Sequence, residues 1–67
     1  MTSIGQKIKS TREDQGLTQE TLAEKAHISR QGLSELENNH REPTLRVLRK
    51  IARALEVDLL TFWPEDE

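Results

Sequence analysis

The sequence predicts an all-α fold, a compact bundle of five short helices, from three observations. Residues of helix-capping type recur, each with an apolar residue four positions later: Thr18 with Leu22, Ser29 with Leu33, Thr44 with Leu48, and Asp58 with Phe62. A side-chain oxygen at such a position accepts from the free N–H groups that begin a helix, and the apolar residue packs the first turn. Apolar residues between the caps follow helical spacing, and no stretch alternates as a β-strand does. Finally, 67 residues without cysteine make one small domain without disulfides.

The caps and the residues that follow each apolar stretch give approximate boundaries. We expect helices over about residues 3–15, 18–26, 29–38 and 44–55, and a short fifth helix after Asp58. Gly16, His27 and Asn39 follow the first three of these segments. Each of these residue types tolerates the left-handed backbone conformation that commonly ends a helix.

The second and third predicted helices have the geometry of a helix-turn-helix. Their caps, Thr18 and Ser29, are eleven residues apart. This distance leaves room for a helix of about two turns and a turn of three or four residues. A second helix placed in this way, with a polar outer face, is suited to the major groove of DNA.

Charge is distributed unevenly along the chain. The formal net charge is −2, yet residues 1–55 hold ten Lys and Arg against seven Asp and Glu. Residues 56–67 hold five acidic residues and no basic one. A surface that binds phosphates is basic, so the longer segment can serve that purpose. Because Pro64 ends regular structure, we expect residues 1–63 to form the domain and residues 64–67 an acidic tail, which either repels DNA or belongs to a subunit interface.

The block from Ile4 to Phe62 resembles the repressor-type helix-turn-helix family of bacterial and phage regulators, often called Xre-like or Cro/repressor-like. The residues that carry the resemblance keep the family's order and spacing: Ile4-Gly5, Lys7-Ile8, Arg12, Gly16-Leu17-Thr18-Gln19, Leu22-Ala23, Ile28-Ser29-Arg30, Leu36-Glu37-Asn38, Arg41, Pro43-Thr44-Leu45 and Ile51-Ala52-Arg53-Ala54-Leu55. The resemblance implies the lambda-repressor-like DNA-binding fold. It also implies a cytoplasmic, bacterial or phage-encoded transcriptional regulator that binds specific sequences of double-stranded DNA.

The helix over residues 29–38 would be the recognition helix. Successive residues of an α-helix are rotated by about 100°, which places Leu33 and Leu36 on the inner face and polar residues on the outer face. The candidates for base contacts are Arg30, Gln31, Ser34 and Glu35. Gln pairs with adenine, Arg grips guanine or a phosphate, Ser contacts bases or backbone, and Glu accepts only from cytosine. The missing side chain of Gly32 either permits a close approach to DNA or is simply tolerated.

The candidates for contacts with the DNA backbone are Gln19, Asn38, His40, Arg41 and Thr44. Gln19 begins the second helix, where the resemblance implies a bond to a phosphate and support for the recognition helix. The free N–H groups of that helix end also favour an anion. The other four residues follow the recognition helix and can fix its register on DNA without reading the sequence.

Two charged sets have structural or undecided roles. Glu37 lies near the inner face, where an unpaired carboxylate would be costly; the resemblance implies a structural ion pair with Arg12. A basic stripe at helical spacing occupies the fourth helix and is either a solvated face or a surface that attracts DNA or an acidic partner. The stripe consists of Arg46, Arg49, Lys50 and Arg53.

Nothing in the sequence supports catalysis. There is no paired nucleophile and base, no phosphate-binding glycine loop and no metal-ligand cluster, and His27 and His40 are thirteen residues apart. We therefore expect no enzymatic activity, no cofactor and no metal. The N-terminal residues lack a hydrophobic signal core, and no apolar run approaches the length of a membrane span, so we expect neither export nor membrane insertion.

The expected partners are double-stranded DNA and a second copy of the chain. A module of this size buries too little DNA for strong specificity, so a homodimer on paired half-sites is expected. The dimer surface would include the fifth helix with Leu59, Leu60, Phe62 and Trp63; alternatively, Phe62 and Trp63 close the bundle. The alternative function is a protein-interaction module on the same fold, antitoxin-like or antirepressor-like, which Glu35 and the acidic tail favour.

Overall fold

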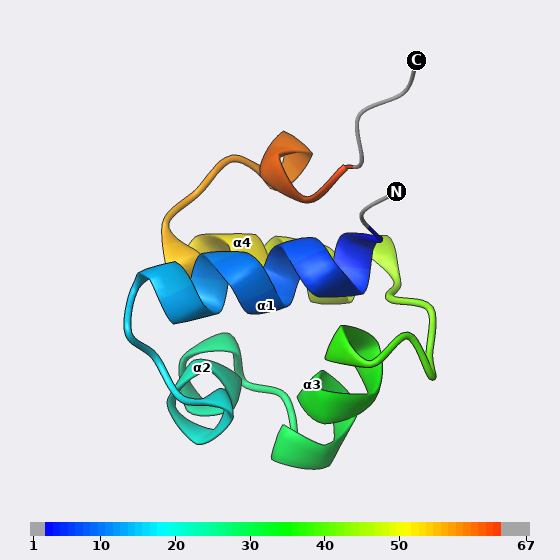
Figure 1. The fold of residues 1–67 in the computed structure, drawn as a ribbon, viewed down its shortest axis with the longest axis horizontal. Helices are drawn as coiled ribbons and strands as arrows, with labels where there is room; N and C mark the ends of the chain where they lie inside the picture. Colours follow the sequence, from blue (N-terminus) through cyan, green and yellow to red (C-terminus); the bar gives the residue numbers. More distant parts are fainter. Residues whose placement is uncertain (1–2, 64–67) are drawn as a thin grey trace.

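The structure, a computed structural model, describes residues 3–63 and shows an all-helical chain (Figure 1). The elements are α1 (Ile4–Asp14), α2 (Gln19–Ala26), α3 (Arg30–Glu37), α4 (Leu45–Leu55) and the 3₁₀ helix η1 (Leu59–Phe62). No strand occurs within this range, which confirms the predicted fold class. The predicted acidic tail, residues 64–67, lies outside the described residues.

The predicted short fifth helix is present only as η1, a single 3₁₀ turn, so the described residues contain four α-helices rather than five helices of regular length. The Asp58 carboxylate accepts from the Leu60 N–H at 2.9 Å, and the Asp58 carbonyl accepts from the Thr61 N–H, also at 2.9 Å. Pro64 follows closely, and a residue before proline avoids the α conformation. The segment is therefore too short for regular α-helix, whereas a 3₁₀ turn suits a short piece of chain.

The predicted caps begin the helices but lie just outside them. Thr18 accepts from the Thr21 N–H at 3.1 Å, Ser29 from the Gly32 N–H at 2.9 Å and Thr44 from the Val47 N–H at 3.2 Å. The predicted left-handed residues are confirmed as well, with φ of 72° at Gly16, 59° at His27 and 63° at Asn39. Glu56, with φ 59°, ends α4 in the same way although its residue type gives no such indication.

The helices lie in layers around one core. Figure 1 shows α1 crossing in front of α4, with η1 on one side of this pair and α2 and α3 on the other. Contacts join α2 to α3 and α4, α1 to α3, and η1 to α1 and α4. The largest fully buried side chains are Phe62, Ile8, Leu22, Leu33, Ile51 and Leu55. No helix within residues 3–63 is both long and apolar enough to cross a membrane.

Phe62 therefore belongs to the core rather than to a dimer surface. Its exposed fraction is 0%, whereas Trp63 is 44% exposed and Leu60 72%. Of the two alternatives for this segment, closure of the bundle is correct for Phe62. Leu60 and Trp63 remain on the surface, so they are available to a partner.

Gly5 allows a close contact between α1 and the end of α3. A Cβ atom at this position would overlap the Leu36 carbonyl oxygen and lie 2.8 Å from Asn39 Oδ1. Protein interiors are packed too densely for such an addition without a shift of backbone. Gly5 thus fixes how closely the first turn of α1 packs against the end of α3.

Candidate nucleic-acid interface

Three residues, His27, Ile28 and Ser29, make the turn between α2 and α3. The left-handed His27 reverses the chain, and the Ile28 N–H donates to the Ala23 carbonyl at 3.0 Å. Ser29 then caps α3. Since Leu33 is fully buried, the inner face of α3 is fixed against the core and its opposite face is left open.

The outer face of α3 carries two side chains without partners. Arg30 and Gln31 are exposed, and neither side chain has a hydrogen-bond partner within residues 3–63. Ser34 is half-buried, and its hydroxyl oxygen lies 3.4 Å from the Asn38 amide nitrogen. Arg30 and Gln31 therefore keep their full hydrogen-bonding capacity for an external partner.

Glu35 forms an ion pair with Arg41, a residue of the loop after α3. The Glu35 Oε1 and Arg41 Nη2 atoms are 2.9 Å apart, with side chains 31% and 62% exposed. A pair at such exposure contributes little to stability. It does compensate the one acidic charge on the outer face, and this lowers the repulsion that the carboxylate would exert on a nearby phosphate.

A buried ion pair joins α1 to the inner face of α3. Arg12 is 8% exposed and Glu37 3%. Arg12 Nε donates to Glu37 Oε2 at 2.7 Å, and Arg12 Nη2 donates to Oε1 at 3.0 Å. The third nitrogen, Nη1, donates to the Leu17 carbonyl at 2.7 Å. The hydrogen bond to Glu37 raises the pKa of the Arg12 guanidinium, and this effect exceeds the opposing desolvation.

Gln19 extends this pair to the start of α2. Its amide Nε2 donates to Glu37 Oε1 at 3.0 Å. An amide group carries two N–H donors, so one remains for a phosphate near the first turn of α2. The same side chain thus ties α2 to α3.

The remaining candidates lie in the loop that leads from α3 to α4. Asn38, His40, Arg41 and Thr44 are all exposed. The Thr44 oxygen already accepts from the Val47 N–H, which leaves the hydroxyl proton to donate. The structure brings Asn38 to Ser34 and Arg41 to Glu35, so this loop is connected to the outer face of α3 by side chains.

Gly32 faces the loop rather than the outer face of α3. It lines a hollow of about 260 Å³ with residues that include Pro43, Thr44 and Val47. A Cβ atom at Gly32 would lie 3.0 Å from Ser29 Oγ, the oxygen that caps α3. Of the two explanations for Gly32, the structure therefore favours the one in which the missing side chain is simply tolerated over the one in which it permits a close approach to DNA.

Two features of this region could not be predicted from the sequence. Gly5 is part of the family resemblance, but its contact with Leu36 joins distant segments and has no local signal. The Glu35–Arg41 pair likewise depends on the path of the loop. The spacing of six residues between opposite charges was the only available indication, and it is not helical spacing.

Comparisons with known proteins show what the chain and its fold are similar to. The chain is 40% identical over 57 residues to the immunity repressor protein of Bacillus phage phi105, a match that covers 85% of this chain and 40% of the repressor. The chain spans about half the length of this repressor and of two SinR regulators that it also matches.

Two solved structures have the same fold. The restriction-modification controller protein C.AhdI from Aeromonas hydrophila has a TM-score of 0.88 at 30% identity, over 90% of this chain and 91% of that protein. SinR, a regulator of biofilm formation solved in complex with DNA, has a TM-score of 0.86 at 35% identity, over 91% of this chain and 98% of that one. The family model described as helix-turn-helix matches residues 8–62, so the chain belongs to the helix-turn-helix family.

Proposed function

We propose that this chain is a transcriptional regulator that binds specific sequences of double-stranded DNA through α3 in the major groove. The observation that carries the proposal is the difference between the two sides of α3. The inner side is fixed by Leu33 and the Glu37 ion pair, whereas the exposed side chains of Arg30 and Gln31 have no hydrogen-bond partner among the described residues. The DNA complex of the similar protein SinR supports the same function for this chain.

The proposed contacts divide into base contacts and backbone contacts. The side chains assigned to bases are Arg30, Gln31, Ser34 and Glu35. The side chains assigned to the backbone are Gln19, Asn38, His40, Arg41 and Thr44. The second set flanks the first on both sides, from the start of α2 and from the loop after α3, as expected for groups that orient a recognition helix.

The proposed functional unit is a homodimer in the cytoplasm of a bacterium, encoded by the bacterium or a phage. Leu45, Leu60 and Trp63 are large apolar side chains with exposed fractions of 51%, 72% and 44%. Leu45 and Trp63 line one hollow of about 680 Å³ together with Ile4. Exposed apolar groups that gather in this way are typical of interaction surfaces. A symmetric dimer would present two copies of α3 to paired half-sites.

The alternative is a protein-interaction module on the same fold, and it is favoured by the acidic charge of residues 56–67. Neither proposal includes catalysis or a cofactor. Binding to a random-sequence duplex, measured by fluorescence anisotropy over a range of salt concentrations, distinguishes the two. A DNA-binding domain releases counterions, so the logarithm of its affinity falls linearly with the logarithm of salt concentration. A protein-interaction module shows no such binding.

A further inference from the structure

A groove between the end of α2 and α4 is lined by basic side chains. Its volume is about 580 Å³. The basic residues on its walls are Lys25, Arg46, Arg49, Lys50 and Arg53. All five are exposed, no acidic residue lines the groove, and none of the five forms a salt bridge in the part of the chain that the structure describes. We call this surface the basic groove; its positive charge has no partner within residues 3–63.

The lining of the basic groove is partly apolar, and the groove extends away from the proposed DNA-facing surface. Ala26, Leu45 and Ala54 also line it, and Leu45 is 51% exposed. Lys25 follows Gln19 by six residues along α2, a separation of about 9 Å along the helix axis. A DNA backbone offers mainly phosphates, which make no use of apolar lining residues. A groove that combines basic and apolar side chains suits a polypeptide segment that carries carboxylates and an apolar side chain.

The chain itself contains such a segment. Residues 56–67 hold five acidic residues and no basic one. Within this range Trp63 is 44% exposed, and Glu65, Asp66 and Glu67 follow it in the sequence. We call residues 63–67 the acidic segment; it combines an apolar ring with three carboxylates.

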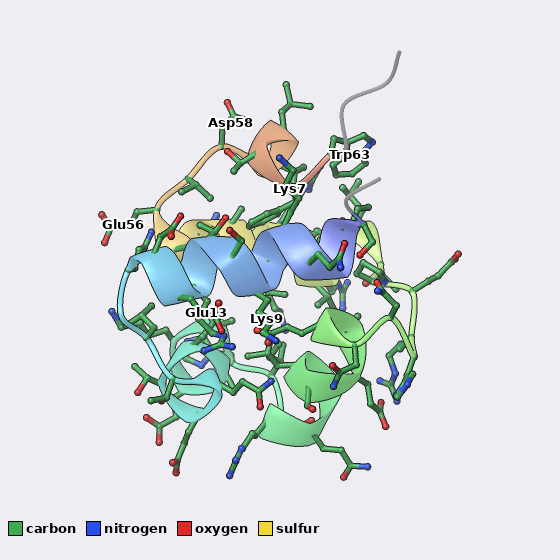
Figure 2. All side chains as sticks on the ribbon, viewed as in Figure 1. Lys7, Lys9, Glu13, Glu56, Asp58 and Trp63 are labelled. Atoms are coloured by element: carbon green, nitrogen blue, oxygen red, sulfur yellow. The ribbon has the colours of Figure 1, made fainter. Side chains whose placement is uncertain are left out.

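The position of η1 favours an acidic segment supplied by another copy. Helix η1 packs on α1 and α4, on the side of this pair that is opposite to α2 and α3 (Figure 1). Asp58 and Trp63 lie on the η1 side of the molecule (Figure 2), whereas the basic groove opens between α2 and α4. A second copy can approach this groove directly, while the chain's own segment must first pass around α4.

We propose that the basic groove of one copy binds the acidic segment of a second copy. This inference rests on the homodimer in the proposed function, and it names the basic groove and the acidic segment as surfaces that meet between the two copies. In a two-fold dimer each contact is made twice, once in each direction. Because exposed charge pairs are weak and screened by salt, the association should be strongest at low ionic strength.

Charge reversal on each side tests the contact in the full chain. The groove variant is Arg49→Glu with Arg53→Glu, and the segment variant is Glu65→Lys, Asp66→Lys and Glu67→Lys. The control variant reverses another exposed basic residue, Lys9→Glu, which lies on the side of α1 opposite to η1 (Figure 2). Sedimentation equilibrium at low and high salt gives the mass of each protein, and circular dichroism establishes that each is folded. If a reversed variant does not fold, Arg49→Ala with Arg53→Ala and deletion of residues 64–67 replace it.

We expect the wild type and the control variant to have the mass of two chains at low salt, and the groove and segment variants to have the mass of one. Mixing the groove variant with the segment variant should restore the mass of two chains, because each again meets an opposite charge. Association that charge reversal leaves unchanged would overturn the groove contact and leave the homodimer standing. A wild type that is monomeric at every salt concentration would overturn both. A mixture that stays monomeric, although each variant alone has lost association, would also overturn the intermolecular contact.

Discussion

The inner and outer faces of α3 differ in what determines their side chains. On the inner face, Leu33, Leu36 and Glu37 are 0%, 4% and 3% exposed, and each is held by the rest of the chain. On the outer face, Arg30 and Gln31 are exposed, and neither side chain forms a hydrogen bond within residues 3–63. Substitution of an inner-face residue should lower the free energy of unfolding, whereas substitution of an outer-face residue should change only the binding to DNA. One helix of eight residues thus separates the two properties by direction.

The largest expected effect tests the inner face. Arg12→Ala leaves the Glu37 carboxylate buried with Gln19 as its remaining side-chain donor. Loss of one partner of a buried pair costs about 3–5 kcal/mol of the free energy of unfolding. Chemical denaturation measures this loss. The control is Glu13→Ala, whose carboxylate is 57% exposed and 3.9 Å from Arg12, and which should cost less than about 1 kcal/mol. An Arg12→Ala protein of wild-type stability that no longer binds DNA would make Arg12 a phosphate contact.

A smaller loss of stability is expected for Gly5→Ala. The added methyl group would overlap the Leu36 carbonyl oxygen, and overpacking of this kind costs about 1–3 kcal/mol. Thermal unfolding measures the effect. Gly32→Ala is the matched control, because its Cβ would meet only the Ser29 side-chain oxygen, at 3.0 Å, and no backbone atom of another helix, so it should cost less than Gly5→Ala. Equal melting temperatures for the two variants would show that α1 does not depend on this close approach.

The outer face is tested by Gln31→Ala. This variant should lose about 1–3 kcal/mol of binding free energy on the preferred site and relax the preference at one or two base positions. Its free energy of unfolding should stay at the wild-type value, since the Gln31 side chain is exposed. Competition binding with single-base variants of the site measures the preference. Unchanged affinity and preference would remove Gln31 from the base contacts.

The smallest effect is expected for Gln19→Ala. This substitution should affect both the binding to DNA and the stability of the fold. It should weaken binding to all sequences alike, because the proposed contact is to a phosphate. It should also cost about 0.5–1.5 kcal/mol of stability, the usual net value of one hydrogen bond, since Nε2 bonds to Glu37 at 3.0 Å. Chemical denaturation measures the loss of stability, and binding to two unrelated duplexes measures the loss of affinity. An altered base preference would show that Gln19 contacts a base instead.

The sequence was informative where structure depends on near neighbours. Thr18, Ser29 and Thr44 cap helices by bonds to backbone three residues away, and such local patterns can be recognised without a structure. The Arg12–Glu37 pair could be predicted from the sequence only because helical periodicity placed Glu37 on the inner face and the family resemblance implied that Arg12 is its partner. The type of the last helix was mispredicted because Pro64 limits its length, which outweighs the capping signal at Asp58.

Features that depend on the path of loops could not be predicted from the sequence. The Gly5 contact joins α1 to the end of α3, the Glu35–Arg41 pair joins α3 to a loop, and the basic groove combines Lys25 of α2 with four residues of α4. Each requires the relative placement of two elements, which no periodicity in one element specifies. Sequence analysis found the stripe on α4 but could not find Lys25 opposite it.

Selection of binding sites from a pool of random duplexes, carried out in parallel with the wild type and Gln31→Ala, tests most directly whether the outer face of α3 reads DNA. We expect the wild type to enrich one short motif, repeated with two-fold symmetry. Gln31→Ala should enrich the same motif with one or two positions relaxed in each half-site. Absence of any enriched motif, or the same motif unchanged in the variant, would contradict the assignment of this face to base recognition.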